Sequence, residues 1–264
     1  MSTVVIVPGF TEGLVIYQEV IHDLLRNRWS VYIHDHRGQG HSAREPAVRD
    51  TPDIGHVERF DDFVADLDAW ITGEVLPAGH ARVFLWAHSM GGAIAARYAM
   101  DHPERLTGLA LVDAGGAPVR REVGGNLAFT LARIPGVNRL AFEIMPRSII
   151  EKSLTQSVAR KEVVTPPVVD RYWELARYPG NRTATLDRFG LGWQMFSPQQ
   201  VAAIDVPTLV MWGERDGMIS PEHGTLFCQD IQRCRLVTYP SLGHLPQEED
   251  PDSTLKALEP FLAS

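Results

Sequence analysis

The sequence has 264 residues, of which 44% are hydrophobic, and its formal net charge is −8. A chain of this length can bury a sizeable core and form either one large α/β domain or two small ones. Its 25 Lys and Arg residues are outnumbered by 33 Asp and Glu residues, and no window interleaves basic with aromatic side chains, which argues against a nucleic-acid partner.

The N-terminal residues predict a strand and a cytoplasmic protein. Residues 1–10, MSTVVIVPGF, lack a positively charged start and a cleavage site, and their short apolar stretch ends at Pro8 and Gly9. No apolar run reaches the length of roughly 18 residues that a transmembrane helix needs. Cys228 and Cys234 are too few for a disulfide framework and match no zinc pattern, so we expect both to be reduced packing residues.

Short β-branched runs alternate along the chain with longer amphipathic segments. The predicted strands are residues 3–8, 30–35, 82–87, 106–113, 207–213 and 234–240. Helical spacing of apolar residues predicts helices around residues 16–25 and 60–71. Strands that alternate with helices in this way form a parallel sheet that is buried on both faces. We therefore predict the α/β class, with a doubly wound and mainly parallel sheet.

The alternation stops between about Pro118 and Pro198, where amphipathic patterns occur without a strand-like run. A stretch of about eighty residues is too long for one crossover and indicates an inserted helical cap. Because sites in parallel sheets open at the carboxyl ends of the strands, a cap inserted after Asp113 would cover the site. We predict a core of residues 1–117 and 199–264, and a cap of residues 118–198.

Ser89 lies between a predicted strand and a run of small residues, within LWAHSMGG (85–92). Ala87 and Gly91 leave room for the sharp strand-to-helix turn called a nucleophile elbow. The helix that follows directs free N–H groups and the positive end of its dipole toward this turn. These residues alone fit a serine that caps a helix equally well.

An acid and a histidine follow Ser89 in the order that an elbow requires. A serine hydroxyl becomes a good nucleophile when a histidine takes its proton and an acid orients that histidine. Asp216 comes just past one predicted strand, and His244 just past the next. Asp113, at another strand end, is the reserve acid, and Glu214 lies closer to its strand than an acid should. We predict catalysis by Ser89, Asp216 and His244.

Acyl transfer also needs N–H donors for the oxyanion that develops on the substrate. The predicted donors are the backbone N–H groups of Met90, directly after the serine, and of Phe10, in the loop after the first strand. Gly9 allows a sharp turn ahead of Phe10, although a Pro-Gly pair is also an ordinary turn.

Four other histidines are expected to be hydrogen-bonding or packing residues. His34, His36 and His41 precede the serine, which is the wrong chain order, and His88 would point the opposite way from Ser89 along the strand.

The motifs PGFTEG, YIHDHRGQGHS, GHVERFDDFVADL and AHSMGGAIA resemble those of the α/β-hydrolase superfamily. Over about residues 4–113 the chain is most similar to the lysophospholipase and monoacylglycerol lipase branch. WGERDGMISP and GHLPQEEDP resemble the acid and histidine motifs of the superfamily. The resemblance implies a serine hydrolase of carboxylic esters with no metal or organic cofactor. Pro8 stands where members usually carry histidine, so hydrogen bonding in that loop is expected to differ.

The substrate is less well defined by the sequence than the triad. No cluster of Arg or Lys follows the predicted strands, which favours a neutral ester over a phosphate head group. A few large apolar cap residues are expected to line an acyl pocket and most to be core. These residues are Phe129, Phe142, Ile144, Met145, Tyr172, Trp173, Trp193, Met195 and Phe196.

The sequence is also compatible with other functions and with a homodimer. The same triad supports hydrolysis of C–C or C–N bonds and perhydrolysis, and such a pocket also serves ligand-binding receptors. Many members of the superfamily begin with an antiparallel hairpin, which is missing ahead of residue 3. The strand at 30–35 is therefore expected at a sheet edge, where it could pair with a second copy in a homodimer. A monomeric mass in light scattering at micromolar concentration would contradict that dimer.

Overall fold

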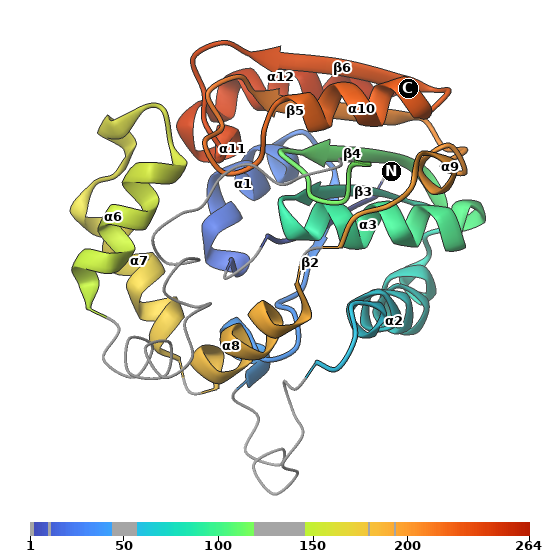
Figure 1. Ribbon diagram of the computed structural model, residues 1–264. Coiled ribbons are helices and arrows are strands. Elements are labelled where there is room, and N and C mark those ends of the chain that lie inside the picture. Colours follow the sequence, from blue (N-terminus) through green and yellow to red (C-terminus); the bar gives the residue numbers. More distant parts are fainter. Residues whose placement is uncertain (1–2, 10–11, 44–56, 119–145, 179, 193) are drawn as a thin grey trace, which may run out of the picture.

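Six parallel strands form the centre of the molecule in a computed structural model, which describes residues 3–9, 12–43, 57–118, 146–178, 180–192 and 194–264 (Figure 1). The strands are β1 (Thr3–Val7), β2 (Ser30–Ile33), β3 (Val83–His88), β4 (Leu106–Val112), β5 (Thr208–Gly213) and β6 (Cys234–Tyr239). Their order is β2-β1-β3-β4-β5-β6, and every neighbouring pair is parallel. The predicted doubly wound sheet is confirmed.

Helices cover both faces of the sheet, as its apolar central strands require. One face packs against α2 (Asp61–Trp70), α3 (Met90–Asp101), α9 (Pro198–Val201) and α10 (Glu222–Asp230). The other face packs against α1 (Gln18–Arg26) and α12 (Pro251–Leu262). Short helical turns occur at Leu14–Tyr17, Gly40–Ala43, Ile71–Val75, Leu76–Ala78, Pro103–Arg105, Lys161–Val163 and α11 (Pro246–Glu249).

The strand order determines where the candidate active site lies in the fold. The chain leaves β1 for β2 on one side and returns to β3 on the other, so β1 and β3 are neighbours whose connections diverge. A crevice at the carboxyl ends of the strands opens at such a switch point. The segments that follow Val7 and His88 therefore meet there, and they carry the predicted oxyanion loop and Ser89.

Three described helices lie between β4 and β5, within the range predicted as a cap. They are α6 (Arg147–Ser157), α7 (Pro166–Arg177) and α8 (Asn181–Leu191), and Figure 1 shows them beside the sheet domain. Three amphipathic patterns in this range predict helices, NLAFTLARI (126–134), PRSIIEKSL (146–154) and PPVVDRYWELAR (166–177). The second and third become α6 and α7, and the first lies outside the described residues. A parallel bridge joins Gly116 to Met195, where the chain leaves β4 and where it returns toward β5. The domain boundaries stay a prediction.

Strand β2 occupies an edge of the sheet, as predicted, with β1 as its neighbour. The homodimer through this edge stays a prediction. Among the helices of the described ranges, none combines the length and the apolar character needed to cross a bilayer.

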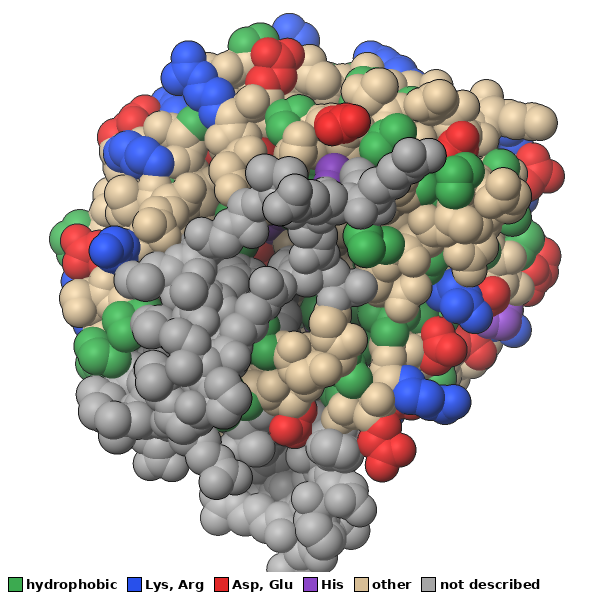
Figure 2. Space-filling view, viewed as in Figure 1, with side chains coloured by type: hydrophobic (Ala, Val, Ile, Leu, Met, Phe, Trp, Pro, Cys, Tyr) green, Lys and Arg blue, Asp and Glu red, His purple; other side chains and the backbone are tan. Residues whose placement is uncertain are grey.

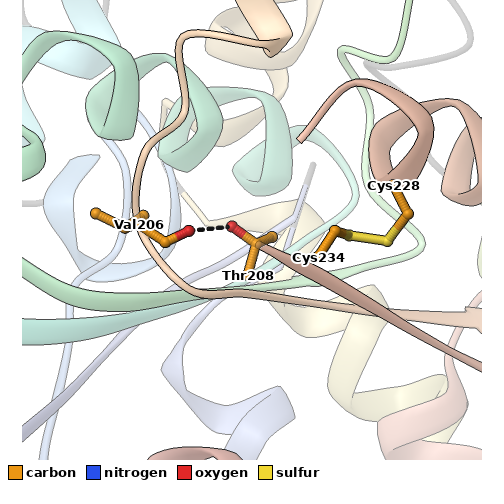
Figure 3. The surroundings of a disulfide bond; sticks show 4 residues. All are labelled: Val206, Thr208, Cys228 and Cys234. Carbon is orange, nitrogen blue, oxygen red and sulfur yellow. Dashed lines mark hydrogen bonds between the residues drawn. A yellow bond between two sulfur atoms is a disulfide. The ribbon is translucent and has the colours of Figure 1, made fainter. Parts of the chain in front are cut away.

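Cys228 and Cys234 form a disulfide, so the expectation that both are reduced is wrong (Figure 3). Cys228 lies in the last turns of α10, and Cys234 begins β6 beside Thr208 of β5. The turn between helix and strand brings their Cα atoms to 5.1 Å, a separation that a disulfide spans. Two cysteines are too few for a disulfide framework, but a single disulfide needs only one local turn that brings them together.

Candidate active site

Ser89 occupies a strained turn between β3 and α3. Its φ of 52° and ψ of −122° lie in a region that residues other than glycine rarely adopt. A Cβ atom on Gly91 would lie 2.2 Å from the carbonyl oxygen of Val7, so only glycine fits there. The Ser89 side chain makes no capping bond to its helix, although it stands at the cap position. The strained turn and the absent cap favour the elbow over the helix-cap interpretation.

The three predicted catalytic side chains are joined by hydrogen bonds. The Nε2 atom of His244 lies 3.0 Å from the Ser89 hydroxyl oxygen, and its Nδ1 atom lies 2.7 Å from Asp216 Oδ2. A carboxylate facing Nδ1 can only accept, so the proton resides on Nδ1 and Nε2 is left to accept from the serine. This is the tautomer that a general base requires.

Asp216 is itself held by backbone donors. Its Oδ1 atom accepts the N–H groups of Met218 at 2.7 Å and Ile219 at 3.0 Å. Burial acts to raise the pKa of Asp216, but the charge and hydrogen bond of His244 and the two N–H groups outweigh it, and the pKa is lowered. Asp216 is therefore ionised at neutral pH and can stabilise an imidazolium on His244.

The loop that carries His244 is anchored to the end of α6. The His244 N–H donates to the carbonyl oxygen of Ser157 at 2.8 Å. The carboxylate of Glu249 accepts the N–H of Gly243 on one oxygen and those of Ala159 and Arg160 on the other, each at 2.8 Å. The loop of His244, the predicted base, is thus held by hydrogen bonds to residues at the end of α6, a helix of the predicted cap.

Asp113, the reserve acid, lies behind the triad rather than in it. It is fully buried, and its Oδ1 atom accepts the Gly213 N–H at 3.0 Å. Burial and the neighbouring charge of Asp216 raise the pKa of Asp113 well above its usual range, which favours its protonated form. Glu214 is turned away, because its carboxylate accepts from the hydroxyl of Thr238. Of these three acids, Asp216 is the one hydrogen-bonded to His244.

Asp113, Asp216 and His244 also bring three ligand-type atoms within 4.8 Å of one another. The ligand-type atoms of Asp216 and His244 already take part in hydrogen bonds. Nδ1 of His244 donates to Asp216, and the second oxygen of Asp216 accepts two N–H groups. A protonated Asp113 adds no charge for a cation. The donor set suits proton transfer better than metal binding.

Of the two predicted oxyanion donors, Met90 lies within the described residues. Met90 begins α3, so its N–H belongs to the first turn, which lacks intrahelical acceptors. Phe10 lies outside the described residues. Gly9, before it, is needed for close packing rather than for a sharp turn, since a Cβ there would lie 2.7 Å from Glu12 Oε2 and 2.9 Å from His88 Nδ1.

The other front-half histidines make structural contacts, as predicted. His36 Nε2 lies 2.9 Å from the carbonyl oxygen of Pro8, and the His34 ring packs between those of His36 and Trp70. The ring of His41 lies beside Tyr178.

His88 contacts His244, the predicted base, a contact that the sequence does not predict. Its Nε2 atom lies 2.7 Å from the carbonyl oxygen of His244, and its Nδ1 atom faces the buried carboxylate of Glu12. Glu12 and Glu249 were also missed. The one available signal for Glu12 was an acid in an otherwise small and apolar loop.

The described cap residues divide between core and surface. Phe196 is buried in the main core, and Met195 is 42% exposed. The Tyr172 hydroxyl donates to Glu248, and Trp173 lies against the guanidinium of Arg177. The other members of the predicted set, Phe129, Phe142, Ile144, Met145 and Trp193, lie outside the described residues. On the face drawn in Figure 2, described Lys and Arg side chains are interspersed with Asp and Glu.

The fold and the serine turn between β3 and α3 place the protein among the α/β hydrolases. Within that class, the chain belongs to the family described as Serine aminopeptidase, S33, whose match covers residues 1–251.

Two curated relatives and one solved structure give the range of chemistry around the chain. Lysophospholipase L2 of Escherichia coli (strain K12) is 44% identical over 108 residues, which span 41% of this chain and 31% of that protein. A 2-hydroxy-6-oxo-6-phenylhexa-2,4-dienoate hydrolase of Comamonas testosteroni is 30% identical over 70% of this chain and 64% of its own. A thermophilic esterase of Thermogutta terrifontis superposes with a TM-score of 0.77 at 23% identity, covering 100% of this chain and 90% of that one. The chain therefore spans less than two thirds of either curated relative.

Proposed function

We propose that the protein is a serine hydrolase that cleaves carboxylic esters through an acyl-enzyme intermediate. The observation that carries the proposal is the continuous hydrogen-bonded chain from Ser89 through His244 to Asp216, at 3.0 and 2.7 Å. No organic cofactor or metal enters the mechanism.

In the first half of the reaction, the Ser89 hydroxyl oxygen attacks the ester carbonyl carbon while its proton moves to Nε2 of His244. Negative charge then develops on the carbonyl oxygen, and the N–H of Met90, together with that of Phe10, stabilises it. When the tetrahedral intermediate collapses, His244 returns the proton to the leaving alkoxide. An alcohol departs, and the acyl group stays on Ser89.

In the second half, His244 takes a proton from a water molecule, which attacks the acyl-enzyme. The intermediate collapses to release a carboxylic acid, and Ser89 regains its proton from His244. Asp216 stays ionised throughout and stabilises the imidazolium that forms twice per turnover. The expected substrates are small to medium acyl esters or monoacylglycerol-type lipids.

A second candidate reaction is hydrolysis of a C–C bond on the same triad. The 30% identity to the Comamonas testosteroni dienoate hydrolase favours it specifically, because that match extends over 70% of the chain. The family description, Serine aminopeptidase, favours C–N hydrolysis in the same way. Ester cleavage is preferred because the match to the lysophospholipase has the higher identity, 44% over 108 residues. The motifs of the front half, including AHSMGGAIA around Ser89, also resemble that branch.

The deciding experiment measures hydrolysis of p-nitrophenyl esters from acetate to palmitate by the wild type and by Ser89→Ala. The variant should lose at least about 10³-fold in kcat, because removing the nucleophile leaves only binding and oxyanion stabilisation. His34→Asn is the matched control for handling and folding, since His34 packs on Trp70 and His36 and contacts no catalytic residue.

Ester turnover that survives in Ser89→Ala would contradict the mechanism. If the folded wild type shows no ester turnover, a panel of amides, 1,5-diketones and peracid formation tests the other chemistries. Tight retention of a ligand after a single slow turnover would instead identify a receptor.

A further inference from the structure

A second histidine–carboxylate pair lies next to the triad and takes no part in the proposed proton transfers. Glu12 is 4% exposed and His88 is 1% exposed. Nδ1 of His88 lies 2.9 Å from Oε1 of Glu12 and 3.1 Å from its Oε2. The rings of His88 and His244 lie 4.9 Å apart between centroids.

The partners of the pair fix its protonation. Nε2 of His88 faces the carbonyl oxygen of His244, which can only accept, so Nε2 carries a proton. Oε2 of Glu12 accepts the Gly9 N–H at 2.8 Å and the hydroxyl of Tyr17, as an ionised carboxylate does. Nδ1 of His88 therefore also donates, and the ring is an imidazolium.

The electrostatics agree with this assignment. Burial alone would lower the pKa of His88, but the charge and hydrogen bond of Glu12 outweigh it and raise that pKa. Burial would likewise raise the pKa of Glu12, but the charge of His88 and the donors around it lower that pKa overall. Both pKa shifts favour the ionised form of the pair.

The pair connects three segments that the reaction needs. Glu12 holds the N–H of Gly9 in the loop after β1, directly before the predicted donor Phe10. His88 is the last residue of β3 and immediately precedes Ser89. Its Nε2–H holds the backbone carbonyl of His244.

A buried ion pair is seldom an efficient source of stability, because desolvation offsets most of the attraction between its charges. A fixed geometry is what such a pair can supply, since each of its polar atoms here has a directed partner. Nothing in the proposed reaction routes a proton through it, because His88 Nε2 faces a carbonyl group.

Resting on the proposed hydrolase function, we propose that Glu12 and His88 are positioning residues. They hold the loop after β1 and the backbone of His244 in the arrangement that Ser89 needs. They touch neither substrate nor reacting atoms.

Two variants should disturb the positioning. His88→Asn places an amide nitrogen near the position of Nδ1, so it keeps the bond to Glu12 and loses the bond to the His244 carbonyl. Glu12→Ala removes the acceptor of Gly9, Tyr17 and His88 together. Each should lower kcat by about 10- to 100-fold, the order expected for a misplacement near 1 Å, and leave KM within about threefold.

A conservative variant should rescue the function. In Glu12→Gln the amide oxygen can accept from Gly9 and Tyr17, and the amide nitrogen can donate to Nδ1 of a neutral His88, whose Nε2–H still holds His244. Every hydrogen bond is kept and the charges are lost, so kcat should stay within about fivefold of wild type. His34→Asn, which removes a histidine outside these segments, should keep kcat within about threefold.

A substrate-free measurement separates this proposal from the proposed function. Histidine-ring NMR should show His88 with both nitrogens protonated at neutral pH and titrating at a higher pH than an ordinary histidine, with the signal identified by its loss in His88→Asn. The Nδ1 proton that His244 shares with Asp216 should exchange with water faster in His88→Asn than in wild type or His34→Asn.

The outcomes are distinct. The proposal is wrong if His88 titrates like an ordinary histidine, or if folded His88→Asn keeps wild-type kcat and wild-type proton exchange. It is also wrong if kcat of Glu12→Gln is as low as that of Glu12→Ala, or if the variants change KM and leave kcat at the wild-type value. If Glu12→Ala does not fold, His88→Asn still decides. If the wild type cleaves no ester, the proposed function fails and the two NMR measurements still test the positioning.

Discussion

Two histidine–carboxylate pairs with nearly the same geometry lie side by side at the carboxyl edge of the sheet. In one, Asp216 contacts His244 at 2.7 Å, and in the other, Glu12 contacts His88 at 2.9 Å. All four side chains are buried. The pairs differ in the partner of the far ring nitrogen, which is the hydroxyl of Ser89 for His244 and a carbonyl oxygen for His88.

That difference decides the chemistry. A hydroxyl can both give and receive a proton, so His244 can alternate between base and acid. A carbonyl oxygen only accepts, so His88 is held as a permanent donor. A buried histidine beside a carboxylate is therefore a general base only when its second nitrogen faces a group that can lose a proton.

The largest loss of activity should come from disrupting the pair of Asp216 and His244. In Asp216→Asn the amide would favour the wrong His244 tautomer, so kcat for a p-nitrophenyl ester should fall by about 10³- to 10⁴-fold. The fall should exceed that of His88→Asn measured in the same assay. A decrease of less than about tenfold would mean that Asp216 does not orient His244.

A smaller effect is expected from the carboxyl group behind that pair. Burial and the charge of Asp216 raise the pKa of Asp113 and so favour its neutral form. Asp113→Asn puts a neutral group of similar shape in its place and should change kcat by less than about tenfold. The difference between the two asparagine variants identifies which acid serves His244. A larger loss in Asp113→Asn than in Asp216→Asn would reverse the assignment.

The smallest expected effect is on the stability of the protein and comes from Glu248, which lies near Glu12 and His88. Burial raises the pKa of Glu248 to about 7, and its carboxylate accepts from Tyr172 of α7. The folded state thus keeps a proton that the unfolded chain releases near pH 4.5, so this group costs stability as the pH rises from about 4.5 to about 7.

Thermal unfolding of the wild type and Glu248→Gln checks this sign. The wild-type Tm should fall relative to that of the variant by a few °C between pH 5 and pH 7.5, because the glutamine cannot ionise. Parallel Tm curves for the two proteins would contradict a raised pKa at Glu248.

Much of the fold and the whole predicted triad follow from local patterns. The runs TVVIV and VFLWAH are apolar except for Thr3 and His88 and are buried throughout, as strands in a sheet covered on both faces are. Ser89, Asp216 and His244 could be found because each follows such a strand, and parallel strands bring their carboxyl ends to one edge. The sequence alone therefore determined the sheet, the elbow and the order of serine, acid and histidine.

The contacts between distant segments depended on tertiary structure. Glu12 and His88 are separated by 76 positions, and His88 and His244 by 156, and no periodic pattern relates them. The disulfide between Cys228 and Cys234 required the turn that joins α10 to β6. Sequence periodicity reports which face of an element is buried, whereas the partner of a buried polar atom depends on the packing of elements far apart in the chain. The chain order predicts that His244 faces the hydroxyl of Ser89, whereas only the packing decided that His88 faces a carbonyl.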